Sequence, residues 1–149
     1  MTSVKVAVRR LPHAADLPLP QYQTHDAAGM DIPAAVSEPV TISAGGRALI
    51  PTGLILAVPR GYEMQVRPRS GLALRHGITL PNSPGTIDSD FRGEVQIIVL
   101  NAGAEPFTIR RGDRIAQMVL SPVVQAEWDE RDELDDTRRG AGGFGHTGT

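Results

Sequence analysis

The sequence predicts an all-β domain built as a jelly-roll-like β-barrel, and three observations support this prediction. The 16 glycines and 12 prolines are spread so evenly that only residues 123–139 lack both for more than eleven positions. Long helices have almost no room between such breakers. The intervals hold short runs of β-branched and apolar residues, and several of these runs alternate apolar with polar side chains. This pattern is typical of an antiparallel sandwich, barrel or jelly roll.

The expected strands follow one another in six runs. They cover residues 4–8, 48–58, 62–66, 94–100, 107–109 and 115–124. One helical turn is expected at residues 71–75, which contain no breaker after the first position.

The length of 149 residues favours one domain. We expect a β-barrel domain at residues 1–137. A flexible, glycine-rich C-terminal arm that closes over the barrel is expected at residues 138–149.

Composition narrows the possible partners and the compartment. The formal net charge of -2 gives no overall basic field, so we expect no nucleic-acid partner. No run approaches the ~20 apolar residues of a membrane span, and the N-terminus lacks the apolar core of a signal peptide. The absence of cysteine excludes disulfides and thiolate metal sites, and it fits a reducing compartment. We therefore expect a cytoplasmic protein with no membrane partner.

The glycines of the arm have the spacing G-x-G-x-x-G, at Gly140, Gly142 and Gly145. A dinucleotide-binding fingerprint needs a strand before this spacing and a helix after it, because the helix N-terminus receives the pyrophosphate. The sequence has no room for a helix after Gly145. We interpret the segment as a backbone-rich arm that can fold over a nucleotide, with Arg139 as its cation and Phe144 as its aromatic side chain.

Residues 85–95, GTIDSDFRGEV, place two carboxylates two positions apart, at Asp88 and Asp90. In a strand this spacing puts both on one face. The preceding NSPG is a turn signal, so the segment is predicted to be a tight hairpin. Two interpretations stay open: a polar hairpin face, or a carboxylate that acts as a general base toward water.

Three further segments hold candidates for an anion or metal site. In PRSGLA, Arg69 supplies a charged fork, Ser70 a hydroxyl, and Gly71 lets backbone N–H groups approach a phosphate. In RGDRIAQMV only Arg114 and Gln117 are candidates, because the other residues suit a turn and a core strand. The remaining segment, AAGMDI, offers a carboxylate at residue 31 that by itself is typical of a turn.

Several common site types do not occur. The four histidines never fall at the spacing of a zinc signature. There is no G-x-S-x-G nucleophile elbow and no G-x-x-x-x-G-K-[ST] phosphate loop.

Taken in order, AAGMDI, PRSGLA, GTIDSDFRGEV, RGDRIAQMV and RGAGGFGHTG resemble the five motifs of the trimeric dUTP diphosphatase (dUTPase) family. The resemblance implies a jelly-roll-like β-barrel and a homotrimer whose chains share three active sites. It implies hydrolysis of dUTP to dUMP and pyrophosphate with Mg²⁺, by water attack at the α-phosphorus. Such an enzyme limits uracil incorporation into DNA and supplies dUMP for dTMP synthesis.

The resemblance also assigns roles to residues of the barrel. Asp88 matches the carboxylate that activates the water, and Asp31 matches the one that holds the metal through bound waters. Arg69, Ser70 and Gly71 match a phosphate-binding segment contributed by a neighbouring chain, and Gln117 matches a polar group near the phosphates. The family's uracil-binding hairpin forms a slot that is too narrow for the methyl group of thymine. The residues that match this hairpin are Asn82, Gly85, Thr86, Ile87, Asp88 and Gln96.

In the arm, Arg139 matches a contact to the γ-phosphate and Phe144 a ring over uracil, and Gly145, His146 and Thr147 match further substrate contacts. Two positions depart from the family pattern. Phe91 stands where tyrosine is usual, and its ring can still exclude a ribose hydroxyl. His146 stands where serine is common, and an imidazolium there would add a pH-dependent contact to the γ-phosphate.

Three alternatives stay open at this point. A dCTP deaminase would share the barrel and part of the hairpin motif, but that relative lacks the complete glycine arm. A catalytically silent nucleotide-binding or regulatory domain would keep the fold without the chemistry, and the presence of Asp88, Asp31, Gln117 and Arg139 argues against it. A dinucleotide-binding module is the weakest, because the sequence shows no βαβ pattern.

Overall fold

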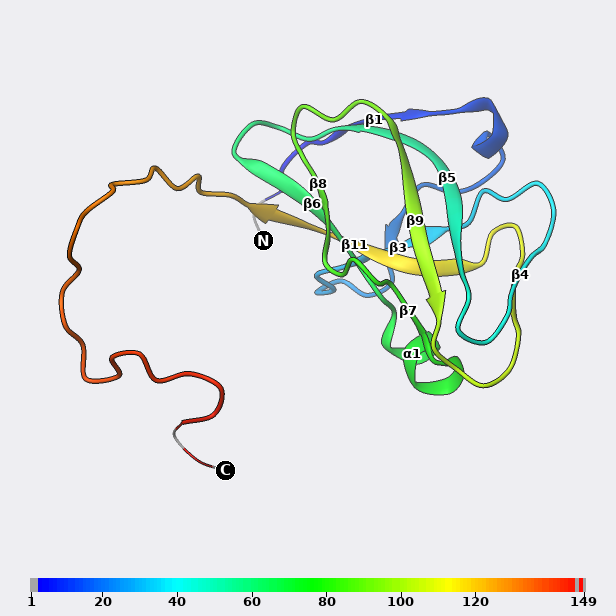
Figure 1. The fold of residues 1–149 in the computed structure, drawn as a ribbon. Coiled ribbons are helices and arrows are strands. Elements are labelled where there is room, and N and C mark those ends of the chain that lie inside the picture. The colour runs from blue at the N-terminus through cyan, green and yellow to red at the C-terminus, as the bar shows by residue number, and fades with distance from the viewer. Residues whose placement is uncertain (1–2, 147, 149) are drawn as a thin grey trace.

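The computed structural model describes residues 3–146 and 148, and it confirms the expected β-rich fold (Figure 1). The elements in chain order are β1 (Ala7–Arg10), η1 (Pro12–Ala14), β2 (Gln21–Tyr22), β3 (Met30–Pro33), β4 (Val40–Ile42), β5 (Arg47–Ala57), β6 (Tyr62–Arg67), α1 (Ser70–His76), β7 (Ile78–Thr79), β8 (Gly85–Ile87), β9 (Glu94–Asn101), β10 (Phe107–Ile109) and β11 (Arg114–Pro122).

The strands form three antiparallel sheets. A five-stranded sheet has the order β2-β3-β11-β6-β8, a four-stranded sheet has the order β1-β5-β9-β7, and β10 pairs with β4. Strands distant in sequence are therefore neighbours, as when β11 lies between β3 and β6. This arrangement confirms the all-β, jelly-roll-like barrel predicted from the alternating runs.

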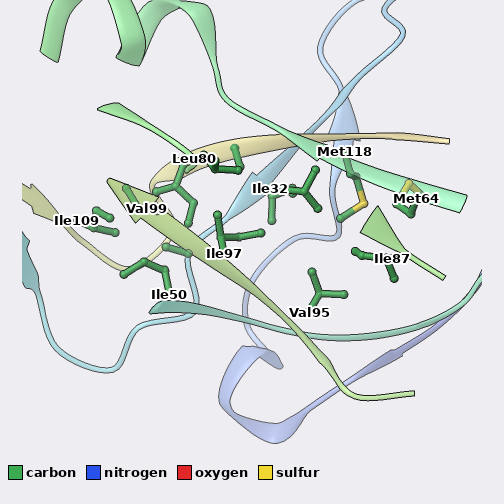
Figure 2. Close-up of a cluster of buried hydrophobic side chains, with 14 of the residues drawn as sticks. Ile32, Ile50, Met64, Leu80, Ile87, Val95, Ile97, Val99, Ile109 and Met118 are labelled. Carbon is green, nitrogen blue, oxygen red and sulfur yellow. The ribbon is translucent and has the colours of Figure 1, made fainter. Parts of the chain in front are cut away.

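The inner faces of the sheets supply one hydrophobic core (Figure 2). Strand β9 shows why: Val95, Ile97 and Val99 are buried, whereas the intervening Gln96 and Ile98 are more exposed, as the period-two pleat requires. Burying one such aliphatic side chain contributes about 1.5–3 kcal/mol. The cluster also draws on β3, β5, β6 and β11, so the core holds both larger sheets together.

The expected helical turn is present as α1. Gly77 ends it with a φ of 68°, and its N–H donates to the carbonyl groups of Leu72 and Ala73. A Cβ at this position would lie 2.5 Å from the backbone nitrogen of Gly103, so only glycine fits. Within residues 3–146 and 148, no helix is long and apolar enough to cross a membrane.

The expected hairpin over residues 85–95 is wrong. Strand β8 pairs with β6, whereas β9 pairs with β5 and β7, so the segment passes from one sheet to the other. Asp88 follows the end of β8, and a turn forms in which the Phe91 N–H donates to the Asp88 carbonyl at 3.2 Å. Asp88 and Asp90 therefore do not share one face of a strand.

Other differences concern the shortest strands. β2, β3, β4, β7 and β8 contain two to four residues each, too few to show a sequence period. The first expected strand lies a few residues later, at β1, and the last one ends at Pro122.

After β11 the chain leaves the sheets. The Val123 N–H donates to the Gly61 carbonyl at 2.9 Å, and the side chains from residue 123 to residue 141 are exposed. Trp128 is 93% exposed. Figure 1 shows this tail running away from the sheets. The start of a flexible arm at residue 138 stays a prediction.

Candidate functional site

An open cleft of about 310 Å³ lies between β8 and the first half of β9. It is lined by every residue that the sequence assigned to the uracil hairpin and by the ring expected against the sugar: Asn82, Gly85, Thr86, Ile87, Asp88, Phe91 and Gln96. Although the segment is not a hairpin, the crossover between sheets faces β8 toward β9 and so builds a slot from both. We call this slot the base cleft.

The turn that carries Asp88 is held by its own neighbours. The Arg92 guanidinium donates to the carbonyl groups of Ser89 and Phe91, both at 2.8 Å. The Phe91 ring lies against Gly93, where a Cβ would come within 2.5 Å of the ring. Asp88 itself is exposed at the rim of the base cleft. A carboxylate at the rim can contact water in the open cleft.

A second group of polar side chains surrounds Asp31 on β3. Its Oδ2 accepts a hydrogen bond from the Arg114 guanidinium and forms an ion pair with the Arg69 guanidinium, each at 3.1 Å, and its side chain is only 11% exposed. Arg69 also donates to the Arg114 carbonyl at 2.8 Å, and Arg114 donates to the Gln23 side chain at 2.9 Å. One carboxylate thus fixes two guanidinium groups, leaving a net positive cluster that suits phosphate oxygens. We call it the Asp31 cluster.

Gln117 belongs to the same cluster. It lies directly opposite Asp31 in the β3–β11 register, and its Nε2 donates to the Pro68 carbonyl at 2.9 Å. A Cβ at Gly29 would lie 2.3 Å from the Gln117 Oε1, so the glycine of AAGMDI leaves room for this side chain.

Ser70 and Gly71 open α1 beside Arg69. A Cβ at Gly71 would lie 3.0 Å from the Arg75 guanidinium, so the Arg75 side chain lies against this first turn of the helix. The two residues are close in sequence to the cluster, and the helix places them next to cationic side chains.

The base cleft and the Asp31 cluster are separate within one chain. On the five-stranded sheet, β3 and β8 have β11 and β6 between them, a distance of about 14 Å at the usual strand spacing. The hollows next to the cluster share no lining residue with the base cleft. The structure thus divides the predicted site residues of the barrel into two groups.

The arm forms a third group. Arg139 donates from Nε to the Gly142 carbonyl at 2.9 Å, His146 lies against Gly142, and Phe144 is fully exposed with a φ of 50°. The arm lies away from the sheets in Figure 1, so the structure does not bring these residues to either group. Thr147 lies outside the described residues.

The described residues hold no cluster of three or more histidine, cysteine or acidic side chains that could bind a metal on their own. Mg²⁺ usually keeps several waters and binds through one or two carboxylates and substrate phosphates. Asp31 fits this pattern, because both of its guanidinium contacts go to Oδ2 and leave Oδ1 to accept from a metal-bound water.

Two residues at the site carried little sequence signal. Glu94 lines the base cleft, yet in sequence it is only the first residue of a strand. Gln23 joins the Asp31 cluster from a segment without a recognisable motif. The cross-strand register that brings them in is absent from local patterns.

Comparison with known proteins agrees with the fold and with the family resemblance. A family model described as dUTPase matches residues 15–148. The dUTPase of Staphylococcus bacteriophage 80alpha, solved with dUPNHPP, has a TM-score of 0.87 at 23% identity, covering 99% of this chain and 100% of that one. A mutant dUTPase of phage phi11 of S. aureus, in which a structural Mg(II) ion is coordinated, has a TM-score of 0.79 at 22% identity, covering 89% and 100%. The match over nearly the whole length shows that this chain belongs to the dUTPase family.

Proposed function

We propose that the chain hydrolyses dUTP to dUMP and pyrophosphate, and that it does so in the cytoplasm. The observation that supports this proposal is the base cleft: all residues expected to recognise uracil line one slot, with Asp88 at its rim. The activity would limit uracil incorporation into DNA and supply dUMP for dTMP synthesis. A chain without cysteine is compatible with the reducing conditions of that compartment.

The proposed reaction is water attack at the α-phosphorus. The Asp88 carboxylate accepts a proton from the water while the water oxygen bonds to the α-phosphorus. The bond from this phosphorus to the oxygen that bridges it to the β-phosphorus breaks, and pyrophosphate leaves. Mg²⁺, when bound with Asp31 through water, would neutralise charge on the triphosphate oxygens. Arg69 would stabilise the negative charge of the triphosphate as well, because each hydrogen bond to an ionised group contributes about 1.5–3 kcal/mol.

Base selection would rest on the cleft walls. Gly85 brings backbone close to the Asn82 side chain, since a Cβ there would lie 3.3 Å from its Nδ2. The Phe91 ring lies against Gly93 and lines the cleft, which supports the expectation that it excludes a ribose 2′-hydroxyl. These contacts favour a deoxyuridine over a thymidine or a ribonucleoside.

A complete site would require more than one chain. The base cleft, the Asp31 cluster and the arm lie apart in a single chain, yet one nucleotide needs all three. A homotrimer with shared active sites resolves this, with one chain supplying the cleft, a neighbour the phosphate-binding residues, and an arm the lid. Light scattering should therefore report three chains per particle.

The products identify the reaction. Incubation with Mg²⁺ and dUTP should release dUMP and pyrophosphate in equal amounts, with far slower turnover of UTP and dTTP. A dCTP deaminase would instead release ammonia from dCTP. A silent binding domain would retain nucleotide without releasing pyrophosphate, and either result would overturn the proposal.

Sharing of the site predicts complementation between two inactive chains. Asp31→Ala and Asp88→Ala should each be inactive as pure trimers. After they are unfolded together and refolded as a mixture, some sites would combine an intact cleft with an intact cluster, so turnover should return. The same protocol applied to each variant alone is the control, and a mixture that stays inactive would contradict sharing.

His146 offers a smaller, pH-dependent effect. Because imidazole gains a positive charge as the pH falls, we expect KM for dUTP to fall at acidic pH more in the parent chain than in His146→Ser. KM measured across the neutral range for both proteins tests this. Superimposable profiles would show that His146 adds no charged contact.

A further inference from the structure

The base cleft is backed by an irregularity in β5. Pro51 pairs with Gln96 and Ile55 pairs with Glu94, so three residues of β5 lie opposite Val95 alone. Such a bulge leaves backbone groups without ladder partners. Side chains near the cleft supply those partners.

The buried part of the bulge is satisfied by Thr52. Its hydroxyl donates to the Val95 carbonyl at 2.6 Å and accepts from the Leu54 N–H at 3.2 Å. The next residue, Gly53, has a φ of 67°, and a Cβ there would lie 2.2 Å from the Ala14 Cβ of η1. Element η1 is therefore pressed directly on the bulge, and only glycine permits this contact.

Glu94 joins the bulge to η1. Its Oε1 accepts from the Gly53 N–H at 2.8 Å and from the His13 Nε2, also at 2.8 Å. A carboxylate can only accept, so the His13 Nε2 is the donor. The Glu94 side chain is 21% exposed and lines the base cleft two residues before Gln96.

Element η1 is itself anchored by a second set of contacts. Arg111 donates to the His13 carbonyl at 2.8 Å and to the Val36 carbonyl at 3.2 Å, and it pairs with Asp16. The Arg111 guanidinium holds the pKa of the Asp16 carboxyl below its usual range. The imidazole of His13 is thus presented to Glu94 from a fixed backbone.

We infer that His13, Glu94 and Gly53 form a clamp that positions the β9 wall of the base cleft and thereby sets the affinity for the nucleotide base. The inference rests on the proposed dUTPase function. Glu94 and His13 are positioning residues: they fix where Gln96 and the start of β9 stand relative to β8. The clamp adjoins the base cleft and shares no residue with the Asp31 cluster, so its loss acts on base binding and not on the chemical step.

Glu94→Ala is expected to raise KM for dUTP about tenfold, the equivalent of one hydrogen-bonded contact, with kcat little changed. Glu94→Gln keeps an oxygen acceptor and should stay near the parent chain. His13→Ala should raise KM less, because the Gly53 bond remains. The double variant should be no worse than Glu94→Ala alone, since His13 acts through Glu94.

A second readout separates positioning from a general loss of stability. The inhibition constant of dUMP should rise by the same factor as KM, whereas that of pyrophosphate should not change. Thr41→Ala is the matched control, because it breaks the Thr41–Thr108 side-chain bond, 2.8 Å long, between β4 and β10. It should lower the melting temperature without changing either constant.

Two results would overturn the inference: an unchanged KM in Glu94→Ala, or equal rises for dUMP and pyrophosphate. Both are distinct from failure of the proposed function, in which the parent chain itself would not hydrolyse dUTP.

Discussion

Asp88→Asn is expected to lower kcat for dUTP by about 10²- to 10⁴-fold, the usual contribution of a general base, with KM little changed. The amide has nearly the shape of the carboxylate but cannot take a proton from water. Asp88 is exposed at the rim of the base cleft, and the turn around it is held by Arg92, so the substitution leaves the cleft walls in place. The loss should therefore appear in turnover and not in binding.

Asp90→Asn is the matched control for this prediction. Asp90 is exposed in the same turn, and the substitution removes the same charge, but the residue does not line the base cleft. Its kcat should equal that of the parent chain. Steady-state kinetics of pyrophosphate release and binding of a non-hydrolysable dUTP analogue measure both quantities. If Asp88→Asn turns over at the parent rate, the assignment of the base is wrong.

The longer strands were predictable because their sequences carry the sheet period over many residues. In β9, the run of β-branched and apolar residues predicts a strand, and the structure shows that Val95, Ile97 and Val99 form its buried face. Strand β8 has three residues, too few to show a sequence pattern, and its partner is β6 rather than β9. The crossover at Asp88 depends on which sheet each strand joins, which is a property of the whole fold.

The site was predictable residue by residue but not as a set of contacts. The motifs indicated Asp31, Arg69 and Gln117, but their meeting depends on β11 lying beside β3, and Arg114 lies 83 positions after Asp31 in the sequence. Glu94 gave no signal, because its importance arises from a bulge in β5. Local spacing identifies which residues are polar, and long-range pairing decides what they touch.

The largest expected effect on stability comes from Asn101, a residue outside the site. It ends β9 and is fully buried, with 0% of its surface exposed. Its Nδ2 donates to the carbonyl groups of Ile42 and Glu105 at 2.9 and 2.8 Å, and its Oδ1 accepts from the Gly103 N–H at 2.9 Å. One side chain therefore joins β4, β9 and the loop before β10.

Asn101→Asp keeps the shape and removes both donors, so a carboxyl oxygen would face two carbonyl oxygens. We expect the free energy of unfolding to fall by about 3 kcal/mol, the scale of buried polar groups that lose their partners. Burial beside two carbonyl oxygens raises the pKa of the new carboxyl group in the folded protein, so the loss of stability should grow as the pH rises above the pKa of this group in the unfolded chain. Urea unfolding at fixed protein concentration measures this, since assembly would couple stability to concentration.

Gln125→Glu makes the same amide-to-carboxylate change on an exposed tail residue and should leave stability unchanged. Equal midpoints for the two variants would show that the Asn101 bonds do not hold these strands together.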